Sequence, residues 1–236
     1  MSDSSVRAAL QDAAVPSPAS APPRPRRSFA AKRSFDIVVT ILLVAILSPL
    51  FLLISFLIKL SNRHVPVLFG HEVVGRDGRT FRMWKFSTMV PDAHLVLKEL
   101  LATDPDLRQE WERDVKLRHD PRILPGIARF LRGSSLNELP QLFNVLMGDM
   151  SLVGPRPITK DEEQLYLQFG GADMLKTRHA QRPGITGLWQ TTGRSDVSYE
   201  ERVGIDADYL RRQSLAFDIE ILIRTVLKVV SRQGAV

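Results

Sequence analysis

The chain has 236 residues, of which 44% are hydrophobic and 25% charged, enough for one domain of ordinary size and too few for two large ones. Its formal charge of +6 at pH 7 predicts an anionic partner, and charge alone leaves nucleic acid, phospholipid head groups and phosphorylated small molecules open. Because the chain has no cysteine, disulfides, a thiolate nucleophile and cysteine-bound zinc are excluded, and a metal is expected to be an oxygen-bound ion such as Mg²⁺.

The N-terminal part divides into a polar tail and an apolar segment. Residues 1–30 are rich in Ala, Ser, Pro and Arg, which cannot supply a packed core and therefore predict a disordered basic tail. Residues 31–62 are predicted to form a membrane-embedded helix, because about 22 uncharged residues from Ile37 to Ile58 match a hydrocarbon layer of roughly 30 Å. A signal peptide is the alternative, but the run is long for one, starts well inside the chain and is followed by no small-residue cleavage site.

Two features of the apolar segment bear on its topology. Pro49 lacks a backbone donor, so the helix is expected to bend at Ser48-Pro49, where the Ser48 hydroxyl can satisfy the freed carbonyl. Basic residues flank both ends, and the positive-inside rule draws both toward the cytoplasm. They are Arg24, Arg26, Arg27, Lys32 and Arg33 before the run and Lys59 and Arg63 after it. We therefore expect a re-entrant helix; the alternative is a kinked spanning helix with the catalytic part outside.

Residues 63–236 are predicted to form one cytoplasmic catalytic domain of a mainly helical α+β fold. Val65–Phe69 and Thr80–Phe86 read as a short β-hairpin around a turn at Gly75–Gly78. A helix is predicted over Pro91–Ala102, and Asp104-Pro105 supplies the cap and first-turn proline of a second helix through about Leu117.

The segment Leu215–Val230 has the pattern of an amphipathic helix. Its predicted apolar side contains Ile219, Leu222, Ile223, Val226, Leu227 and Val230. Basic residues recur every four positions on another side, at Arg224, Lys228 and Arg232. Such a helix is expected to lie in the membrane interface with its basic side toward lipid phosphates, and the alternative is a surface helix packed on a soluble core.

Three blocks concentrate glycine, proline and charged residues where packing does not require them. They are Lys85-Phe86-Ser87-Thr88-Met89; Leu131 to Gln141 continuing into Gly148 to Pro157; and Arg182-Pro183-Gly184-Ile185-Thr186-Gly187-Leu188-Trp189-Gln190. On these blocks the chain resembles the bacterial sugar transferase family, the monotopic phosphoglycosyl transferases, in particular members that initiate exopolysaccharide synthesis with galactose or glucose phosphate. The resemblance extends from Lys32 to about Val230.

The resemblance implies an enzyme that transfers a sugar 1-phosphate from a nucleotide diphospho-sugar, UDP-galactose or UDP-glucose, to polyprenyl phosphate. It also implies a re-entrant helix with Ser-Pro at its bend, in the bacterial inner membrane, with the catalytic domain facing the cytoplasm. In the family mechanism an aspartate of an Asp-Glu pair attacks the sugar-bearing phosphate, and the Glu and Mg²⁺ assist. Membrane lipids are expected partners, and an oligomer is left open. Nucleic acid is not expected, because aromatic residues are 7% of the chain and no nucleic-acid motif is present.

The residues that match the family motif give the candidate site. Lys85, Arg132, Arg156 and Arg182 are candidate phosphate-binding cations, since a diphosphate and a lipid phosphate bring several negative charges together. Asn137, Glu138 and Asp206 are the candidate catalytic residues, and Glu138 is the candidate metal ligand. Structural alternatives are a capping box over Ser135 to Glu138 with Asn137 as a good N-cap, and a surface aspartate at position 206.

Two positions depart from the family pattern. Asn137 stands where the resemblance implies the nucleophilic aspartate, and an uncharged amide is a far weaker nucleophile and metal ligand than a carboxylate. The hypothesis is a phosphoglycosyl transferase with altered or reduced covalent chemistry, in which Glu138 or another carboxylate takes the role. The alternative is a catalytically impaired or inactive homologue that binds the same ligands. Ser87 replaces an arginine, which removes one phosphate-binding cation from the block that retains Lys85.

Overall fold

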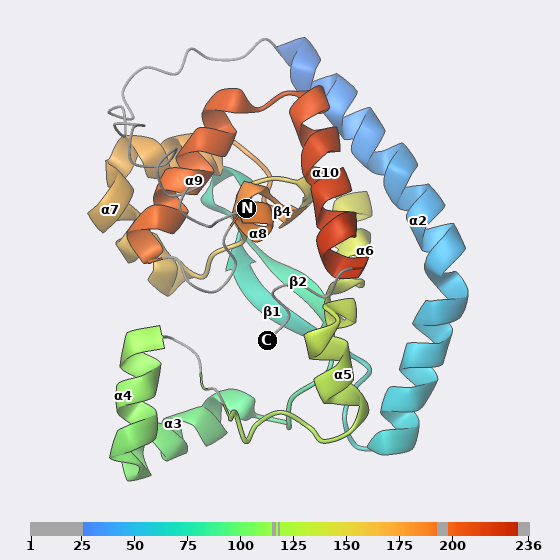
Figure 1. Cartoon of the computed structure of the whole chain (residues 1–236), viewed down its shortest axis with the longest axis vertical. Coiled ribbons are helices and arrows are strands. Elements are labelled where there is room, and N and C mark those ends of the chain that lie inside the picture. Colours follow the sequence, from blue (N-terminus) through green and yellow to red (C-terminus); the bar gives the residue numbers. More distant parts are fainter. Residues whose placement is uncertain (1–25, 115–116, 118, 193–197, 231–236) are drawn as a thin grey trace, which may run out of the picture.

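The computed structural model of the protein describes residues 26–114, 117, 119–192 and 198–230 (Figure 1). The helices are α2 Arg26–Ser61, α3 Ala93–Thr103, α4 Pro105–Asp114, α5 Ile127–Gly133, α6 Gln141–Met147, α7 Lys160–His179, α8 Leu188–Thr192, α9 Tyr199–Arg212 and α10 Leu215–Val230. Short 3-10 helices, η2 and η3, cover Arg76–Gly78 and Leu136–Glu138. The strands are β1 Leu68–Val74, β2 Thr80–Phe86, β3 Ser151–Val153 and β4 Gly184–Thr186. The mainly helical α+β fold with a short hairpin is confirmed.

Helix α2 contains the apolar segment and begins inside the predicted tail. Its first residue is Arg26, so residues 26–30 are helical, while residues 1–25 lie outside the described part of the chain. The stretch Ala30–Ser61 is long and apolar enough to cross a membrane, judged by length and composition. The helix runs through Pro49 without a break, and Figure 1 shows it as one bowed helix along the side of the molecule.

The predicted role of Ser48 at the proline is confirmed. Pro49 has no N–H to give to the carbonyl four residues earlier, that of Ala45. The Ser48 hydroxyl donates a hydrogen bond of 2.8 Å to the Ala45 carbonyl oxygen. The side chain therefore supplies the bond that the proline removes, and the helix continues through its middle.

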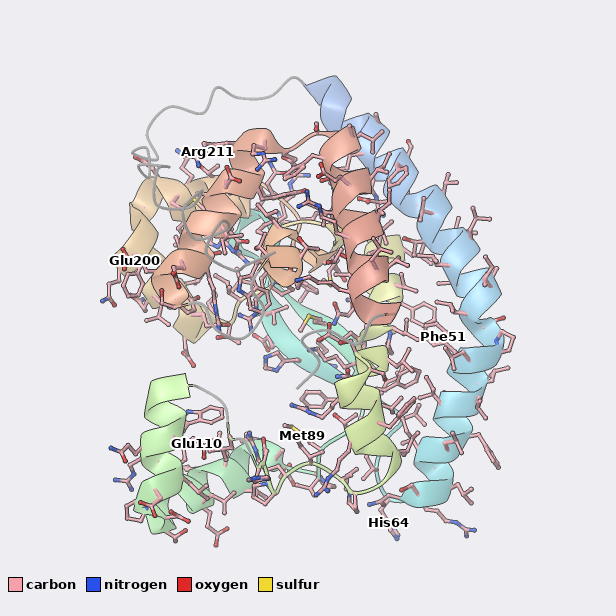
Figure 2. All side chains as sticks on the ribbon, viewed as in Figure 1. Phe51, His64, Met89, Glu110, Glu200 and Arg211 are labelled. Atoms are coloured by element: carbon pink, nitrogen blue, oxygen red, sulfur yellow. The ribbon has the colours of Figure 1, made fainter. Side chains whose placement is uncertain are left out.

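One side of α2 packs against the rest of the molecule along its whole length. The inward residues are Phe35, Val39, Leu43, Val44, Leu47, Leu50, Phe51, Ile54 and Ile58. Phe51, on the inner side of the helix in Figure 2, has its ring centre 5.7 Å from that of Phe86 and 5.5 Å from that of Phe143. The other side exposes large apolar side chains, namely Val38, Ile41, Leu42, Ile46, Leu52, Leu53, Phe56 and Leu60.

The predicted hairpin is present, but its first strand lies further along the chain than the predicted Val65–Phe69. Strand β1 begins at Leu68 and extends to Val74, pairing antiparallel with β2 so that Phe69 faces Lys85. The prediction stopped at Phe69 because Gly70, His71 and Glu72 interrupt the apolar pattern. The strand continues because Val73 and Val74 are buried, and because Val74 also donates a 2.7 Å backbone bond to Ile158. The predicted turn is confirmed as η2.

The two helices after the hairpin are confirmed with shifted ends. Helix α3 starts at Ala93 rather than Pro91, and α4 is described as far as Asp114, while Leu117, the predicted end, is not helical. The Asp104 carboxylate accepts backbone N–H bonds from Asp106 and Leu107 at 3.0 and 3.1 Å, which is the predicted cap. Figure 1 shows α3 and α4 set apart from the rest of the fold.

Helix α10 has its predicted bounds but a different buried side. It packs on the core through Phe217 and Ile221, which are 7% and 0% exposed. The predicted apolar side is largely on the surface, where Ile219, Ile223, Val226 and Leu227 are exposed. The surface helix packed on a core was therefore the better description of its inner side, and interfacial placement of its outer side stays a prediction.

Asn144 of α6 fixes the hairpin to the helical body. It is fully buried, its amide oxygen accepts from the Trp84 N–H at 2.9 Å, and its amide nitrogen donates to the Arg82 carbonyl at 2.7 Å. These two bonds act on the strand residues just before Lys85. Buried polar groups that lose their partners carry the full cost of desolvation.

We therefore expect Asn144→Ala to lower the free energy of unfolding by about 2–4 kcal/mol, because it leaves one donor and one acceptor of β2 unsatisfied. The measurement is chemical unfolding of the detergent-solubilised chain. Gln164→Ala, on the exposed side of α7, is the matched control and should change stability little. Equal stability of both variants would show that Asn144 does not support the strand.

Candidate active site

The Lys85–Glu138 ion pair forms the centre of the candidate site. Lys85 is the penultimate residue of β2 and Glu138 ends η3, and Lys85 Nζ lies 2.9 Å from Glu138 Oε1. Their side chains are 27% and 40% exposed, so a ligand can reach both. Beneath them, Phe86 and Leu131 are buried against the C-terminal half of α2. The site therefore lies directly on the apolar helix.

Asn137 lies beside Glu138 in the same turn, but it is not a cap. It is 8% exposed, and the residue before the turn, Ser135, has a left-handed backbone with φ of 60°. The Ser135 side chain makes no capping bond, and α6 begins only after Pro140. The capping-box alternative for this segment is therefore wrong, because the left-handed residue turns the chain before a helix is established.

Arg132 joins the pair from the end of α5. Its Nη1 lies 3.5 Å from the Thr88 hydroxyl, within the block that contains Lys85. Burial lowers the pKa of Arg132, and the nearby Asp120 and Glu138 carboxylates oppose that effect. Lys85, Arg132, Asn137 and Glu138 thus come together, as the resemblance implied.

Sequence reasoning missed the structure that supports this cluster. Asp120 holds the Arg122 guanidinium through bonds of 2.8 and 2.6 Å. Two backbone hydrogen bonds join this segment to the end of the Lys85–Met89 block. The Val90 N–H donates to the Arg122 carbonyl at 2.9 Å, and the Leu124 N–H donates to the Thr88 carbonyl at 3.0 Å. The sequence Asp120-Pro121-Arg122, which is typical of a turn, was the pattern from which this support could have been predicted.

Arg156 belongs to a second cluster. Its Nη1 lies 2.8 Å from Glu162 Oε1, and its guanidinium stacks over the Trp189 ring at 5.5 Å. Burial alone would lower the pKa of Arg156, but Glu162 more than offsets this and raises it. Glu162 also closes a capping box with Thr159 at the start of α7. The Thr-x-x-Glu spacing was a signal for Glu162 that sequence reasoning did not use.

Asp206 lies beneath Arg156 rather than in an open site. It is 3% exposed and accepts a hydrogen bond from the Tyr166 hydroxyl. Arg178, which is 1% exposed, donates a 2.6 Å bond to the Arg156 carbonyl and stacks over the Tyr166 ring at 5.2 Å. Burial raises the pKa of Asp206 to about 6, against the lowering effects of Tyr166, Arg178 and Arg156. This geometry fits a residue that positions the Arg156 loop.

His71 links the two clusters. It is on the same face of the hairpin as Lys85, two pairs beyond the Phe69–Lys85 pair. The pKa of His71 is lowered by burial first and then by Lys85 and Arg156, while Glu162 opposes the shift. A neutral imidazole therefore lies among the charged groups of both clusters. No pattern in the sequence singled it out.

Arg182 is placed away from these groups. Its Nε donates a 2.7 Å bond to the Gly148 carbonyl, close to Arg33 and Asp36 of α2. Burial lowers the pKa of Arg182, and Arg33 and Arg76 lower it further. Of the four predicted phosphate-binding cations, the structure thus brings Lys85 and Arg132 together. Arg156 lies in the second cluster, and Arg182 lies at the end of α6.

The second and third sequence blocks meet through a two-stranded parallel sheet. Ser151 pairs with Gly184 and Val153 with Thr186. A side chain at Gly154 would lie 2.6 Å from the Arg182 carbonyl oxygen, and one at Gly184 would lie 2.1 Å from the Gly154 nitrogen. These glycines are needed because the two backbones approach too closely for a Cβ atom.

The described residues fit Mg²⁺ only as an ion shared with a substrate. Among the residues with described positions, no group of three or more His, Asp or Glu side chains is arranged to hold a metal. Glu138 is the accessible carboxylate, since Asp120 is occupied by Arg122. Mg²⁺ commonly binds one or two carboxylates together with substrate phosphates. Glu138 is therefore the residue that would hold the ion.

Together these features define a small α+β domain with a cationic, carboxylate-bearing site built on an apolar helix. The family model described as bacterial sugar transferase matches residues 27–232, and the chain belongs to that family. It is 48% identical over 86% of its length to the undecaprenyl-phosphate galactose phosphotransferase of Salmonella typhimurium, and 37% identical over 84% to the UDP-glucose:undecaprenyl-phosphate glucose-1-phosphate transferase of Escherichia coli.

The matched region makes up different shares of these relatives. It covers 41% of the Salmonella protein and 39% of the Escherichia protein, so the chain spans about two fifths of their length. The exopolysaccharide production protein ExoY of Rhizobium meliloti is 42% identical over 87% of this chain, and 88% of ExoY is covered.

The buried position of Asp206 gives a prediction for pH. With its pKa raised from 3.8 to about 6, the folded chain keeps a proton that the unfolded chain releases near pH 4. The stability from this group is present at low pH and lost as pH rises to about 6. We expect the melting temperature of wild type minus that of Asp206→Asn to fall between pH 4.5 and 6.5 and then stay constant. Asp208→Asn, on the same helix, is the control; a difference that rises with pH would contradict the assignment.

Proposed function

We propose that this chain transfers a sugar 1-phosphate from a nucleotide diphospho-sugar, UDP-galactose or UDP-glucose, to polyprenyl phosphate and so initiates exopolysaccharide synthesis. The observation that carries the proposal is the exposed Lys85–Glu138 pair, with Arg132 and Asn137 beside it, on the apolar helix α2. Relatives named as transferases of this kind support it, and nothing in the comparisons favours an inactive homologue.

The charges of the site match those of the reaction. The bond between the sugar-bearing phosphorus and the bridging oxygen breaks, the nucleoside monophosphate leaves, and a bond to an oxygen of the lipid phosphate replaces it. Lys85 and Arg132 offset the negative charge of the diphosphate and of the leaving phosphate. Bound Mg²⁺, held by Glu138 and the phosphates, would add charge stabilisation to the same groups.

Asn137 sets the covalent step apart from that implied by the resemblance. Its amide does not form an acyl phosphate as a carboxylate does, and Glu138 is the carboxylate next to it. We propose that a Glu138 carboxylate oxygen attacks the sugar-bearing phosphorus as the bond to the nucleoside monophosphate breaks, and that an oxygen of the lipid phosphate then displaces Glu138 and restores its carboxylate. Without a covalent intermediate, Glu138 would instead orient the lipid phosphate for direct attack. In both routes Asn137 limits the rate.

The activity test is release of nucleoside monophosphate from each UDP-sugar with Mg²⁺ and polyprenyl phosphate. We expect Glu138→Gln to reduce the rate at least about 100-fold and Asn137→Asp to raise it about tenfold or more, since each changes the charge available at the reacting phosphate. Lys85→Gln should raise KM for the donor, and Lys98→Gln on α3 is the matched control. An unchanged rate in Asn137→Asp would overturn the role of Asn137, and an unchanged rate in Glu138→Gln would overturn the site.

We further propose that α2 is a re-entrant helix and that the rest of the chain lies on the cytoplasmic face of the bacterial inner membrane. Both halves of α2 pack on the same globular body, from Phe35 to Ile58. A helix that spanned the bilayer with this packing would place that body, with its charged groups, inside the hydrocarbon layer, which is costly. A helix dipping in from one side keeps the body in water and its opposite side in lipid. The exposed apolar side of α10 fits the same boundary.

Cysteine labelling tests this topology directly, because the chain contains no cysteine. Ser34→Cys and Ser61→Cys place exposed thiols before and after the apolar run. We expect a membrane-impermeant maleimide to label both only in inside-out vesicles, because both ends lie on the cytoplasmic side. Leu52→Cys, within the exposed apolar side, should stay unlabelled from either side. Labelling of Ser34→Cys and Ser61→Cys from opposite sides would show a spanning helix.

A further inference from the structure

A cationic pocket lies outside the candidate active site. It is a shallow site between the N-terminal part of α2, the hairpin turn and the end of α7. Lys32, Arg33, Arg76 and Arg182 line it together with a single carboxylate, that of Asp36. The function proposed above uses none of these residues, and Arg182, a predicted phosphate-binding cation, lies away from Lys85.

The carboxylates around this pocket are already engaged. Lys32 Nζ lies 2.6 Å from Asp218 Oδ2, so its charge is matched. Asp36 is 2% exposed and accepts bonds from the Ser151 hydroxyl at 2.8 Å and the Leu152 N–H at 3.3 Å. Arg76 has its own partner, since its Nε lies 3.6 Å from Asp77 Oδ2 in a pair that is open to solvent.

Arg33 and Arg182 are held by neutral partners instead. Arg33 donates to the Val145 and Leu146 carbonyls at 2.6 and 3.1 Å, and Arg182 uses its Nε on the Gly148 carbonyl at 2.7 Å. These bonds cap the end of α6 and so explain the position of both guanidinium groups. The helix end carries only a partial negative charge, which balances the two positive charges only in part. Over the described ranges, no carboxylate lies within 4.0 Å of either of them. The pKa of Arg182 is lowered first by burial and then by Arg33 and Arg76, while Asp36 and Asp77 oppose the shift.

The position of the pocket separates it from the Lys85–Glu138 pair and places it near the lipid. Arg33 lies one helical turn before Ile37, where the apolar run begins. Arg76 lies in the hairpin turn, whereas Lys85 pairs with Phe69 at the open end. The five strand steps from Phe69 to Val74 correspond to roughly 17 Å.

We propose that this pocket binds a phosphate group, supplied by the head group of an anionic phospholipid at the membrane surface. An oxyanion accepts bonds from the remaining N–H groups of Arg182 and from the exposed Arg76, and it supplies the negative charge that Arg33 and Arg182 lack. The phosphate chemistry follows from the cations alone. The choice of a lipid over a soluble phosphate rests on the membrane association proposed above.

The test compares melting temperatures of the full chain in an uncharged detergent at constant ionic strength. The added compounds are inorganic phosphate, dihexanoyl phosphatidylglycerol and dihexanoyl phosphatidylcholine. We expect phosphatidylglycerol at a tenfold excess over Kd to raise the melting temperature by about 3–6 °C, and phosphatidylcholine to have little effect. Arg76→Gln should lose the rise; Arg76 is 48% exposed, so this variant keeps the fold. Arg79→Gln removes an equal charge three residues away and should keep the rise.

Lys85→Gln separates the pocket from the candidate active site, and it should also keep the rise. Stabilisation by inorganic phosphate alone would support a phosphate site and overturn the lipid assignment. The proposal as a whole is overturned if no compound stabilises the chain, if Arg79→Gln loses as much as Arg76→Gln, or if Lys85→Gln abolishes the effect. Because no turnover is measured, these outcomes are independent of whether the chain proves to be a transferase.

Discussion

The packing of α2 along its whole length is the interaction on which the other features depend. Its N-terminal half supports the large core around β3 and α10, and its C-terminal half supports the smaller cluster beneath Phe86 and Leu131. The candidate active site is built on that second cluster. Because the site is attached to α2 through this cluster, the position of α2 in a membrane would fix the distance of the Lys85–Glu138 pair from the lipid surface. The transfer proposed above joins a water-soluble donor to a lipid-borne acceptor, and a fixed position of the site at the membrane surface lowers the entropic cost of bringing the two together.

Buried polar side chains position the exposed ones. Asn144 holds the strand that carries Lys85, and Asp36 holds β3 through Ser151 and Leu152. Asp206 does the same beneath the Arg156 loop. Each of these groups is at most 3% exposed, so it is costly unless every partner is in place. Such groups contribute less to stability than apolar residues of the same size, but they favour one arrangement of the backbone over its neighbours. In this protein they occur where loops carry charged residues.

The sequence predicted the parts of the fold that depend on local pattern. The apolar run, the turn at Gly75–Gly78, the Asp104 cap and the bounds of α10 all follow from the periodicity or chemistry of adjacent residues. It did not predict the end of β1, because pairing of Val74 with Ile158 is a tertiary contact. The inward side of α10 was missed for a related reason: apolar residues lie on both sides of that helix, and only the core decides which are buried.

The candidate site was predicted in composition but not in arrangement. Lys85, Arg132, Asn137 and Glu138 come together, whereas Arg182 caps the end of α6 and Asp206 lies under a loop. The spacing of two cations along the chain does not determine their distance in the folded protein. The presence of a charge on a side chain likewise does not predict whether that side chain is buried. Glu162 and Glu201 show what was available, since both close Ser/Thr-x-x-Glu capping boxes. The same pattern at Ser135 fails because that residue is left-handed.

The burial of Asn137 gives a physical reason to expect altered chemistry. Glu138 already has Lys85 as a counter-charge, and both are partly exposed. A carboxylate at position 137, where the side chain is 8% exposed, would add a second negative charge beside Glu138. Two adjacent carboxylates repel, and this raises the pKa of one of them unless a cation is bound between them. An amide avoids that repulsion with Glu138. It does so by giving up the charge that makes a carboxylate a nucleophile.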